Sequence, residues 1–291
     1  MDKSLLVAVG DDMSSLHGVR FLSSFFSQKE NMEVTLCYIA PTSVSKDFQV
    51  PAQPLRPQRL DQEITAQYSR TGHESIDAGI DILLSKGFQK PKVTAKYRGK
   101  RLGTVKDLVQ EGKRGNYDAV LLGRRGYVLF EQALAASVSR QMLDQTVDFP
   151  IWICRQPEEG RRHVLLCMDP SEPSMRIADH VGFMLKEEKQ HDVKLLCVDD
   201  GGQENMNHTL EKGKQLLLVN GVDEERITSQ IIKASNVPEA ILSEADRNAY
   251  AVVAMGRGGA PQKGLFKKWF IGSRSLKVFE TISKSVLWLS R

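Results

Sequence analysis

The chain has 291 residues, of which 41% are apolar and 26% are charged, and its formal net charge at pH 7 is +4. This composition is ordinary for a soluble globular protein, and so small a charge gives no argument for a nucleic-acid partner. No run approaches about 18 consecutive apolar residues and the N-terminus lacks the pattern of a secretory signal, so we expect no membrane partner and a cytoplasmic location.

The first series of elements runs to the middle of the chain. Short apolar runs predict strands at Leu5–Val9, Val34–Ile39, Val93–Tyr97, Asp118–Gly123 and Ile151–Arg155. Apolar residues three and four apart predict a helix after the first strand, a second helix that ends at Gly87, and a third at Val105–Arg114. The stretch Pro41–Gln62 carries four prolines, and we expect a long loop that serves as a lid, an interaction arm or a tolerated insertion.

A polar segment at residues 156–162 is expected to link this series to a second one of the same order. The predicted strands of the second series are Val164–Met168, Val193–Val198, Ile227–Ile231, Tyr250–Gly256 and Val286–Arg291. The helices between them are expected around Ile177–Leu185, up to Gly221, and at Pro238–Asp246. The last strand of each series contains a tryptophan between apolar residues, Trp152 and Trp288, which we expect to be packing or interface residues.

This internal repeat predicts the fold class. Strands that alternate with helices form parallel sheets with right-handed crossovers. We therefore expect an α/β fold made of two tandem copies of a five-stranded parallel open sheet flanked by helices, with domains at residues 1–156 and 162–291. An apolar terminal strand left open invites pairing, so the two last strands are expected to join the copies as a pseudo-dimer. The sequence leaves open whether two copies of the whole chain also form a homodimer.

The four cysteines all lie inside apolar runs and form no C-x-x-C pair. Buried free thiols are the expected state, in preference to disulfides, metal ligands or nucleophiles. The six histidines are scattered and none is four residues from another, so no metal site is predicted. Asp199 and Asp200 beside Gly201 are interpreted as a strand-to-loop turn in preference to a cation site.

Each copy carries a glycine loop after its fourth strand. The first reads Gly123-Arg124-Arg125-Gly126, followed after nine residues by Ala136-Ser137-Val138-Ser139. The second reads Gly256-Arg257-Gly258-Gly259, followed after twelve residues by Gly272-Ser273-Arg274-Ser275. Glycine lets the backbone approach a phosphate, and the N-terminus of a following helix adds N–H donors. Helix caps and turns without any ligand are the alternative interpretation.

The joint pattern of these segments resembles the universal stress protein family. That pattern is a first strand ending in Asp, a fourth strand ending Met-Gly-x-x-Gly, and a later Gly-Ser-x-Ser. The resemblance covers nearly the whole chain twice, except for Pro41–Gln62 and the linker. It implies a Rossmann-like fold of the adenine nucleotide alpha hydrolase type and an adenine nucleotide as ligand: ATP, with or without Mg²⁺.

Carried onto the second copy, the resemblance implies a set of nucleotide-binding residues. Those near the adenosine are Asp169, Pro170 and Val198; those on the ribose and phosphate side are Met255, Gly256 and Gly259; those that meet the phosphates are Gly272, Ser273, Arg274 and Ser275. The twelve-residue spacing departs from the family's nine, which puts the position of the loop amides in doubt.

The first copy departs further from the family pattern. Gly10 stands where the aspartate is expected, and Ala136 replaces a glycine of the later segment. Its weaker candidates are Asp11, Ile39, Gly123, Gly126, Ser137 and Ser139. The second copy is therefore expected to be the one that binds ATP.

Motifs for sharper chemistry are missing from the sequence. It contains no G-x-x-x-x-G-K-[ST], no G-x-G-x-x-G after the first strand, and no G-x-S-x-G elbow. No residue stands out as a general base, so no catalytic residues are assigned and turnover beyond a slow ATPase is not expected. Two functions remain: a stress-response regulator that binds ATP through the second glycine loop, or a protein-interaction module, with protein partners still to be identified, that has lost nucleotide binding.

Overall fold

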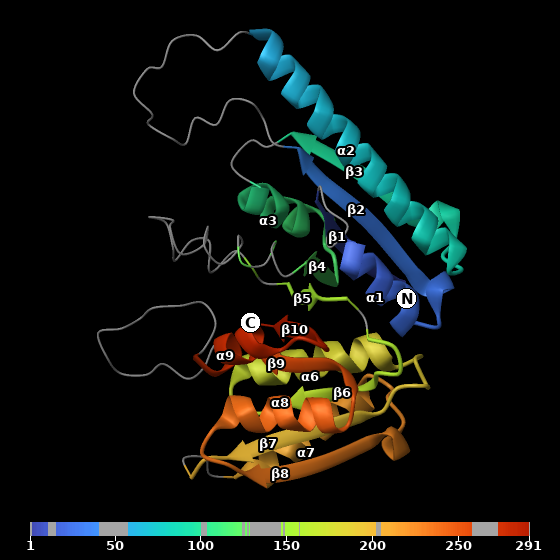
Figure 1. Ribbon diagram of the computed structural model, residues 1–291. Coiled ribbons are helices and arrows are strands. Elements are labelled where there is room, and N and C mark those ends of the chain that lie inside the picture. The colour runs from blue at the N-terminus through green and yellow to red at the C-terminus, as the bar shows by residue number, and fades with distance from the viewer. Residues whose placement is uncertain are drawn as a thin grey trace, which may run out of the picture.

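The strands of this protein form one continuous sheet. The computed structural model describes residues 2–10, 16–40, 58–99, 104–123, 126, 128, 147, 149–156, 158–201, 205–257 and 273–290. Within them, the ten-stranded sheet has the order β3-β2-β1-β4-β5-β10-β9-β6-β7-β8. Figure 1 shows the N-terminal half, in blue and green, meeting the C-terminal half, in yellow to red, where β5 and β10 lie side by side.

The N-terminal half contains the first series of predicted elements. Its strands are β1 (Lys3–Val9), β2 (Met32–Ala40), β3 (Val93–Gly99), β4 (Ala119–Gly123) and β5 (Ile151–Cys154), and every pairing among them is parallel. Its described helices are α1 (His17–Phe25), α2 (Gln58–Ser85) and α3 (Thr104–Gly115). One boundary corrects the sequence prediction: α2 begins at Gln58, so the end of the expected loop, residues 58–62, is helical. Residues 41–57 lie outside the described part of the chain.

The C-terminal half repeats that order. Its strands are β6 (Arg162–Cys167), β7 (Val193–Asp199), β8 (Ile227–Lys233), β9 (Tyr250–Gly256) and β10 (Val286–Ser290), again with parallel pairing inside the half. Its helices are α6 (Glu172–Leu185), α7 (Met206–Val219), α8 (Val237–Arg247) and α9 (Ser273–Thr281). The predicted α/β class with two copies of a five-stranded parallel sheet is confirmed. The domain limits of 1–156 and 162–291 stay a prediction.

Two glycines end corresponding helices in the two halves, as predicted. Gly87 follows α2 with φ of 95°, and Gly221 follows α7 with φ of 92°. A side chain is strained at such positive φ, whereas glycine adopts it readily and can accept the left-handed turn that stops a helix. Both helices therefore end where their sequences place a glycine.

Helices cover both faces of the sheet because its strands are apolar on both sides. One buried cluster joins alternate strand residues such as Leu5 and Val7 to α1, α2, α6 and α7. The other joins the intervening residues, such as Leu6, to α3, α8 and α9. This alternation is the period of two expected of a strand, and burial on both faces explains why the strands are continuous apolar runs.

The two halves meet through their last strands. β5 and β10 pair antiparallel, with Trp152 opposite Trp288. The two indole rings stack with centroids 4.1 Å apart and an angle of 6° between their planes. Both tryptophans are fully buried, which confirms that they are packing and interface residues and that the terminal strands form the contact. Neither half of the sheet therefore has an open edge at this position.

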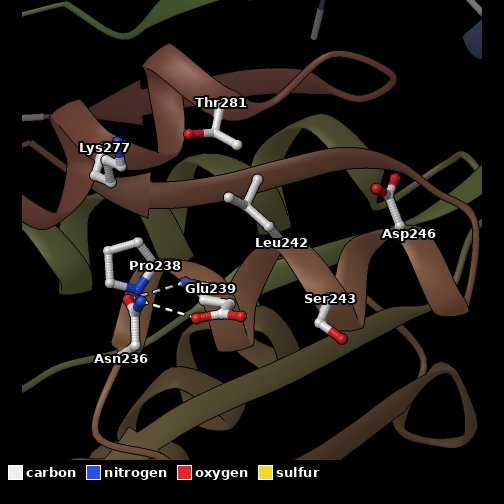
Figure 2. Close-up of a pocket in the computed structure, with 8 residues that line it drawn as sticks. All are labelled: Asn236, Pro238, Glu239, Leu242, Ser243, Asp246, Lys277 and Thr281. Atoms are coloured by element: carbon white, nitrogen blue, oxygen red, sulfur yellow. Dashed lines mark hydrogen bonds between the residues drawn. The ribbon is translucent and has the colours of Figure 1, made fainter.

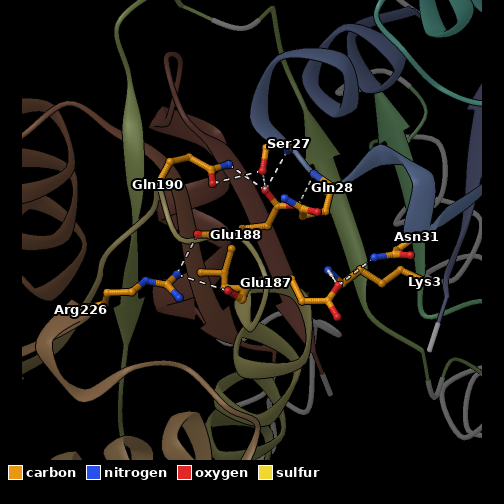
Figure 3. Close-up of polar contacts among 9 residues, drawn as sticks. Lys3, Ser27, Gln28, Asn31, Glu187, Glu188, Gln190 and Arg226 are labelled. Atoms are coloured by element: carbon orange, nitrogen blue, oxygen red, sulfur yellow. Dashed lines mark hydrogen bonds and ion pairs between the residues drawn. The ribbon is translucent and has the colours of Figure 1, made fainter.

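A polar network reinforces this contact beside the sheet (Figure 3). Glu188, in the segment after α6, is fully buried, and its carboxylate accepts hydrogen bonds from the amide of Ser27 at 2.7 Å and the amide of Gln28 at 3.1 Å. The hydroxyl of Ser27 and the amide group of Gln190 also donate to it, each at 2.7 Å. Three of these four hydrogen bonds cross the boundary between the halves, and the bond from Gln190 lies within the C-terminal half.

The buried residues also bear on the thiol predictions. Cys37, Cys154, Cys167 and Cys197 are all free and buried, as predicted. Burial raises the pKa of the Cys197 thiol to about 12, with the nearby Asp169 carboxylate adding to the effect, so this thiol is protonated at neutral pH.

No helix in the described ranges is long and apolar enough to cross a membrane.

Candidate functional site

The strand order of the C-terminal half reverses between β6 and β9. The chain moves from β6 to β7 on one side of β6, whereas β9 and then β10 lie on the other side. In open parallel sheets, ligands bind outside the carboxyl ends of the strands at such a reversal. The residues that follow β6 and β9 are therefore the first to consider.

Asp169 follows β6 and lies against the beginning of α6. Its carboxylate accepts hydrogen bonds from the amide of Ser171 at 2.9 Å and from the hydroxyl of the same residue. Its own amide donates to the hydroxyl of Ser174 at 3.0 Å. Ser171 is the N-cap of α6, so the aspartate is held in the turn that starts this helix. The side chain is half-buried and stays partly open to solvent.

Gly256 ends β9 and touches the same turn. A Cβ atom at this position would lie 2.7 Å from the amide nitrogen of Ser174 and 2.9 Å from the carbonyl carbon of Pro173. Both are backbone atoms that cannot move without shifting α6, so only glycine fits here. The glycine therefore allows the end of β9 and the start of α6 to approach each other at the reversal point.

The first turn of α9 reaches this edge from the other side. The hydroxyl of Ser275, which is buried, donates to the carbonyl of Gly256 at 3.2 Å. Arg274, the neighbouring residue, is half exposed and forms an ion pair with Asp200, which directly follows β7. The structure therefore brings together Asp169, Gly256, Arg274 and Ser275 around the carboxyl ends of β6 and β9.

The remaining predicted residues of the second copy lie at different depths. Val198 and Met255 are buried in the core cluster on the α8 and α9 side of the sheet. Pro170 is exposed in the turn after Asp169, and Ser273 begins α9. Gly259 and Gly272 lie outside the described residues.

The weaker candidates of the first copy form a less complete set. Ile39 is buried close to the end of β2, Gly123 is the last residue of β4, and Gly126 is exposed. Because β1 separates β2 from β4, the first two lie on either side of the strand that ends before Gly10. Asp11, Ser137 and Ser139 lie outside the described residues.

A groove between α8 and α9 lies on the outer face of the C-terminal half (Figure 2). The residues that line it include Pro238, Glu239, Leu242 and Asp246 on α8, and Lys277 on α9. None of the predicted ligand residues lines this groove. It is separate from the carboxyl edge of β6 and β9.

Three residues of the site were not predicted from the sequence. Ser171 and Ser174 orient Asp169, and the signal for them was present, because serines after a strand that ends in Asp-Pro are common N-caps. Asp200 was interpreted as part of a turn. The Asp199 carboxylate does accept the amide of Gly201 at 2.9 Å, as in such turns, but the side chain of Asp200 reaches Arg274. The described residues contain no cluster of metal-binding side chains.

A match to a protein-family model identifies the C-terminal half. Residues 160–289 match the model described as the universal stress protein family. This half of the chain belongs to the universal stress protein family. A search of curated proteins finds no significant match. The predicted resemblance is thus confirmed by a match that covers the second copy.

Solved structures extend the comparison to the fold of the whole chain. A universal stress protein from Archaeoglobus fulgidus DSM 4304 aligns over 99% of this chain and 98% of its own, with 16% identity and a TM-score of 0.66. A functionally unknown protein from Pseudomonas aeruginosa PAO1 covers 99% and 92%, with 12% identity and a TM-score of 0.51. At these identities the likeness establishes the shared fold alone.

A third structure is a universal stress protein in complex with cAMP. It covers 45% of this chain and 97% of its own, with 17% identity and a TM-score of 0.37. So partial an overlap supports no inference about a ligand of this chain.

Proposed function

We propose that this chain is a cytoplasmic stress-response regulator that binds an adenine nucleotide, ATP, at the carboxyl edge of β6 and β9. The observation that carries the proposal is the meeting of Asp169, Gly256 and the first turn of α9 at the point where the strand order reverses. We also infer that residues 1–156 and 162–291 are the two structural units, which the repeated strand order supports.

Each residue has a distinct role in this proposal. The carboxylate of Asp169 accepts hydrogen bonds from the adenosine part of the ligand, on the side open to solvent. The phosphates lie toward Arg274 and Ser275, where the N-terminus of α9 adds unpaired N–H groups and its positive dipole end. Gly259 and Gly272 complete the loop around the phosphates, as the family resemblance implies. In the first copy Gly10 replaces the aspartate, so we propose that only the second copy binds.

A ligand-free interaction module is the second candidate. One observation favours it: Asp169 already accepts two hydrogen bonds from Ser171, the N-cap of α6, so its place in the sequence is explained by orienting that cap alone. In that case ATP would have no effect on the stability of the protein.

Ligand-linked stability separates the two candidates. ATP at about 100-fold excess over its dissociation constant stabilises the native state by roughly 2.7 kcal/mol, because the unfolded chain has no site. We expect a higher thermal midpoint with ATP, with or without Mg²⁺, and nucleotide that co-purifies with the protein. A midpoint insensitive to millimolar ATP would support the interaction module.

Asp169→Ala tests the ligand role of the aspartate. Loss of a hydrogen bond to a charged group should weaken ATP binding by about 10- to 100-fold, as measured by calorimetry. Ser171→Ala is the matched control, because it removes the hydroxyl that caps α6 but keeps the Asp169 carboxylate. It should lower stability by about 1 kcal/mol and leave ATP affinity within about threefold. Equal losses of affinity in both variants would mean that Asp169 acts only through the helix.

A further inference from the structure

The ion pair between Arg274 and Asp200 joins two elements that are far apart in the sequence. Arg274 is the second residue of α9, and Asp200 is the first residue after β7. The Asp200 side chain is 17% exposed and that of Arg274 is 49% exposed, so the pair lies at the surface with its carboxylate partly enclosed.

The position of this pair follows from the strand order. The bond from Ser275 to the carbonyl of Gly256 fixes the start of α9 at the end of β9. β6 lies between β9 and β7, and neighbouring strands are about 4.8 Å apart, so the two partners come from strand ends separated by roughly 10 Å. The ion pair therefore connects the two sides of the edge at which β6 ends and Asp169 follows.

The chemistry of the guanidinium group makes this pair competitive with a ligand. The planar fork of an arginine donates to a carboxylate and to a phosphate through the same N–H groups. A phosphate group beside Ser275 would lie next to Arg274, the preceding residue, whose guanidinium is paired with Asp200. Once the pair opens, the carboxylate of Asp200 is no longer neutralised by the arginine and would repel the phosphate.

We propose that Asp200 is a specificity-determining residue, which holds Arg274 in the ligand-free protein and is displaced from it by the phosphates of a bound nucleotide. This inference rests on the proposed nucleotide site. A ligand without phosphate leaves the pair intact and gains nothing from Arg274. A polyphosphate gains hydrogen bonds from Arg274 but must first break the ion pair. Asp200 therefore lowers the preference of the site for phosphorylated ligands over ligands without phosphate.

Calorimetric titration of the full chain with adenosine, AMP and ATP tests this inference. Asp200→Asn frees Arg274 and should raise ATP affinity by about 2- to 10-fold, the range set by partly exposed ion pairs and the lost repulsion, while adenosine affinity stays within about twofold. Arg274→Gln should lower ATP affinity, and Asp200→Asn added to it should have a markedly smaller effect than in the wild-type protein.

Glu280→Gln is the matched control. Glu280 lies on the same helix, is 55% exposed and pairs with Lys277 at 3.9 Å, so its removal changes the net charge by the same amount as Asp200→Asn. It should leave ATP affinity within about twofold, because exposed charges about 10 Å apart are largely screened at 0.1 M salt.

The outcomes separate this inference from the proposed function. If the wild-type protein binds ATP but Asp200→Asn leaves or lowers its affinity, or raises adenosine affinity equally, Asp200 does not compete and only the further inference fails. If Glu280→Gln matches Asp200→Asn, the effect is one of overall charge and the inference also fails. If the wild-type protein binds none of the three ligands, the proposed function fails and this inference fails with it.

Discussion

The stacked tryptophans are alike, but their polar neighbours differ. The Nε1 group of Trp152 donates to the Nε2 atom of His180 at 3.0 Å, whereas that of Trp288 has no partner among the described residues. Leu5 pairs with Val34 in β2 and Val164 pairs with Val193 in β7, and each pair is separated by 29 residues, so Leu5 of one half aligns with Val164 of the other. At the same offset, His180 aligns with Phe21. Burial lowers the pKa of His180 to about 3, which keeps its ring neutral and able to accept this bond.

His180→Phe tests the importance of this one acceptor. The change copies the residue of the other half and should cost roughly 1–3 kcal/mol at pH 7, because it leaves a second indole N–H buried without a partner. The cost should shrink between pH 7 and pH 5. The folded wild-type protein binds no proton at His180 in this range, whereas the unfolded chain binds one below about pH 6.5. The free energy of unfolding of the wild-type protein therefore decreases as the pH decreases from 7 to 5.

Urea denaturation of both proteins at the two pH values measures the difference. All other titrating groups are shared, so they cancel when the two free energies of unfolding are subtracted. An equal difference at pH 7 and pH 5 would contradict the neutral, buried state of His180.

At the scale of elements, the segment after α6 joins the halves by a contact that is not repeated. The contact places the carboxylate of Glu188 from one half against amides just after α1 in the other. By the same alignment, Glu188 corresponds to Lys29, which has no carboxylate, so the first half cannot make the equivalent contact. Arg226 supports this segment from within its own half by donating to the carbonyls of Leu185, Glu188 and His191. These bonds hold the backbone of the segment beside its contact with α1.

Glu188→Gln tests this contact. A glutamine keeps the shape but replaces one acceptor oxygen with a donor, so buried amides lose their partner and we expect a loss of about 2–4 kcal/mol. Glu74→Gln is the control, because Glu74 is 63% exposed and its ion pair with Arg70, at 3.0 Å, is exposed on both sides; its loss should be below about 1 kcal/mol. Chemical denaturation at pH 7 compares the two, and similar losses would refute the special role of Glu188.

Acid should weaken the same contact. Burial acts to raise the pKa of Glu188, but the hydrogen bonds from Gln190, Ser27 and Gln28 outweigh it and hold the pKa below its ordinary value of 4.5. The stabilisation is therefore complete above that ordinary value and is lost as the pH falls through the lowered pKa.

At the scale of the whole molecule, the continuous sheet makes the two halves one unfolding unit. β5 and β10 pair directly, and their tryptophans pack against Phe21, Phe25 and His180 from helices of both halves. Separation of the halves would expose all of this apolar surface at once. We therefore expect a single cooperative transition for the described core.

Trp152→Ala should lower the stability of both halves together. Removal of a fully buried tryptophan costs about 3–5 kcal/mol, and the loss falls on the surface that the halves share. Thermal unfolding followed by far-ultraviolet circular dichroism and by the fluorescence of the remaining tryptophans should shift to the same lower midpoint. Two separate transitions, with one unchanged, would show that the halves unfold independently.

The sequence predicted most of this fold because its signals are local. Apolar runs marked the strands, Gly87 and Gly221 marked helix ends, and the repeat predicted the pairing of the terminal strands. The contacts of Glu188 and Asp200 were not predicted, since each partner lies more than 70 residues away and its position depends on how the sheet folds. The turn around Asp169 was predicted in part: the aspartate was identified through the family resemblance, but the hydrogen bonds that it accepts from Ser171 were not predicted.

The parallel tryptophans also give the protein an optical property. Two indoles stacked at 4.1 Å exchange excitation energy, so Trp152 and Trp288 absorb and emit as a coupled pair, whereas Trp269 is a third emitter elsewhere in the sequence. Any event that separates the halves, whether the binding of a partner or unfolding by a denaturant, would uncouple the two chromophores. The coupling of these two tryptophans can therefore be used as an intrinsic spectroscopic probe of the contact between the two halves, without an added label.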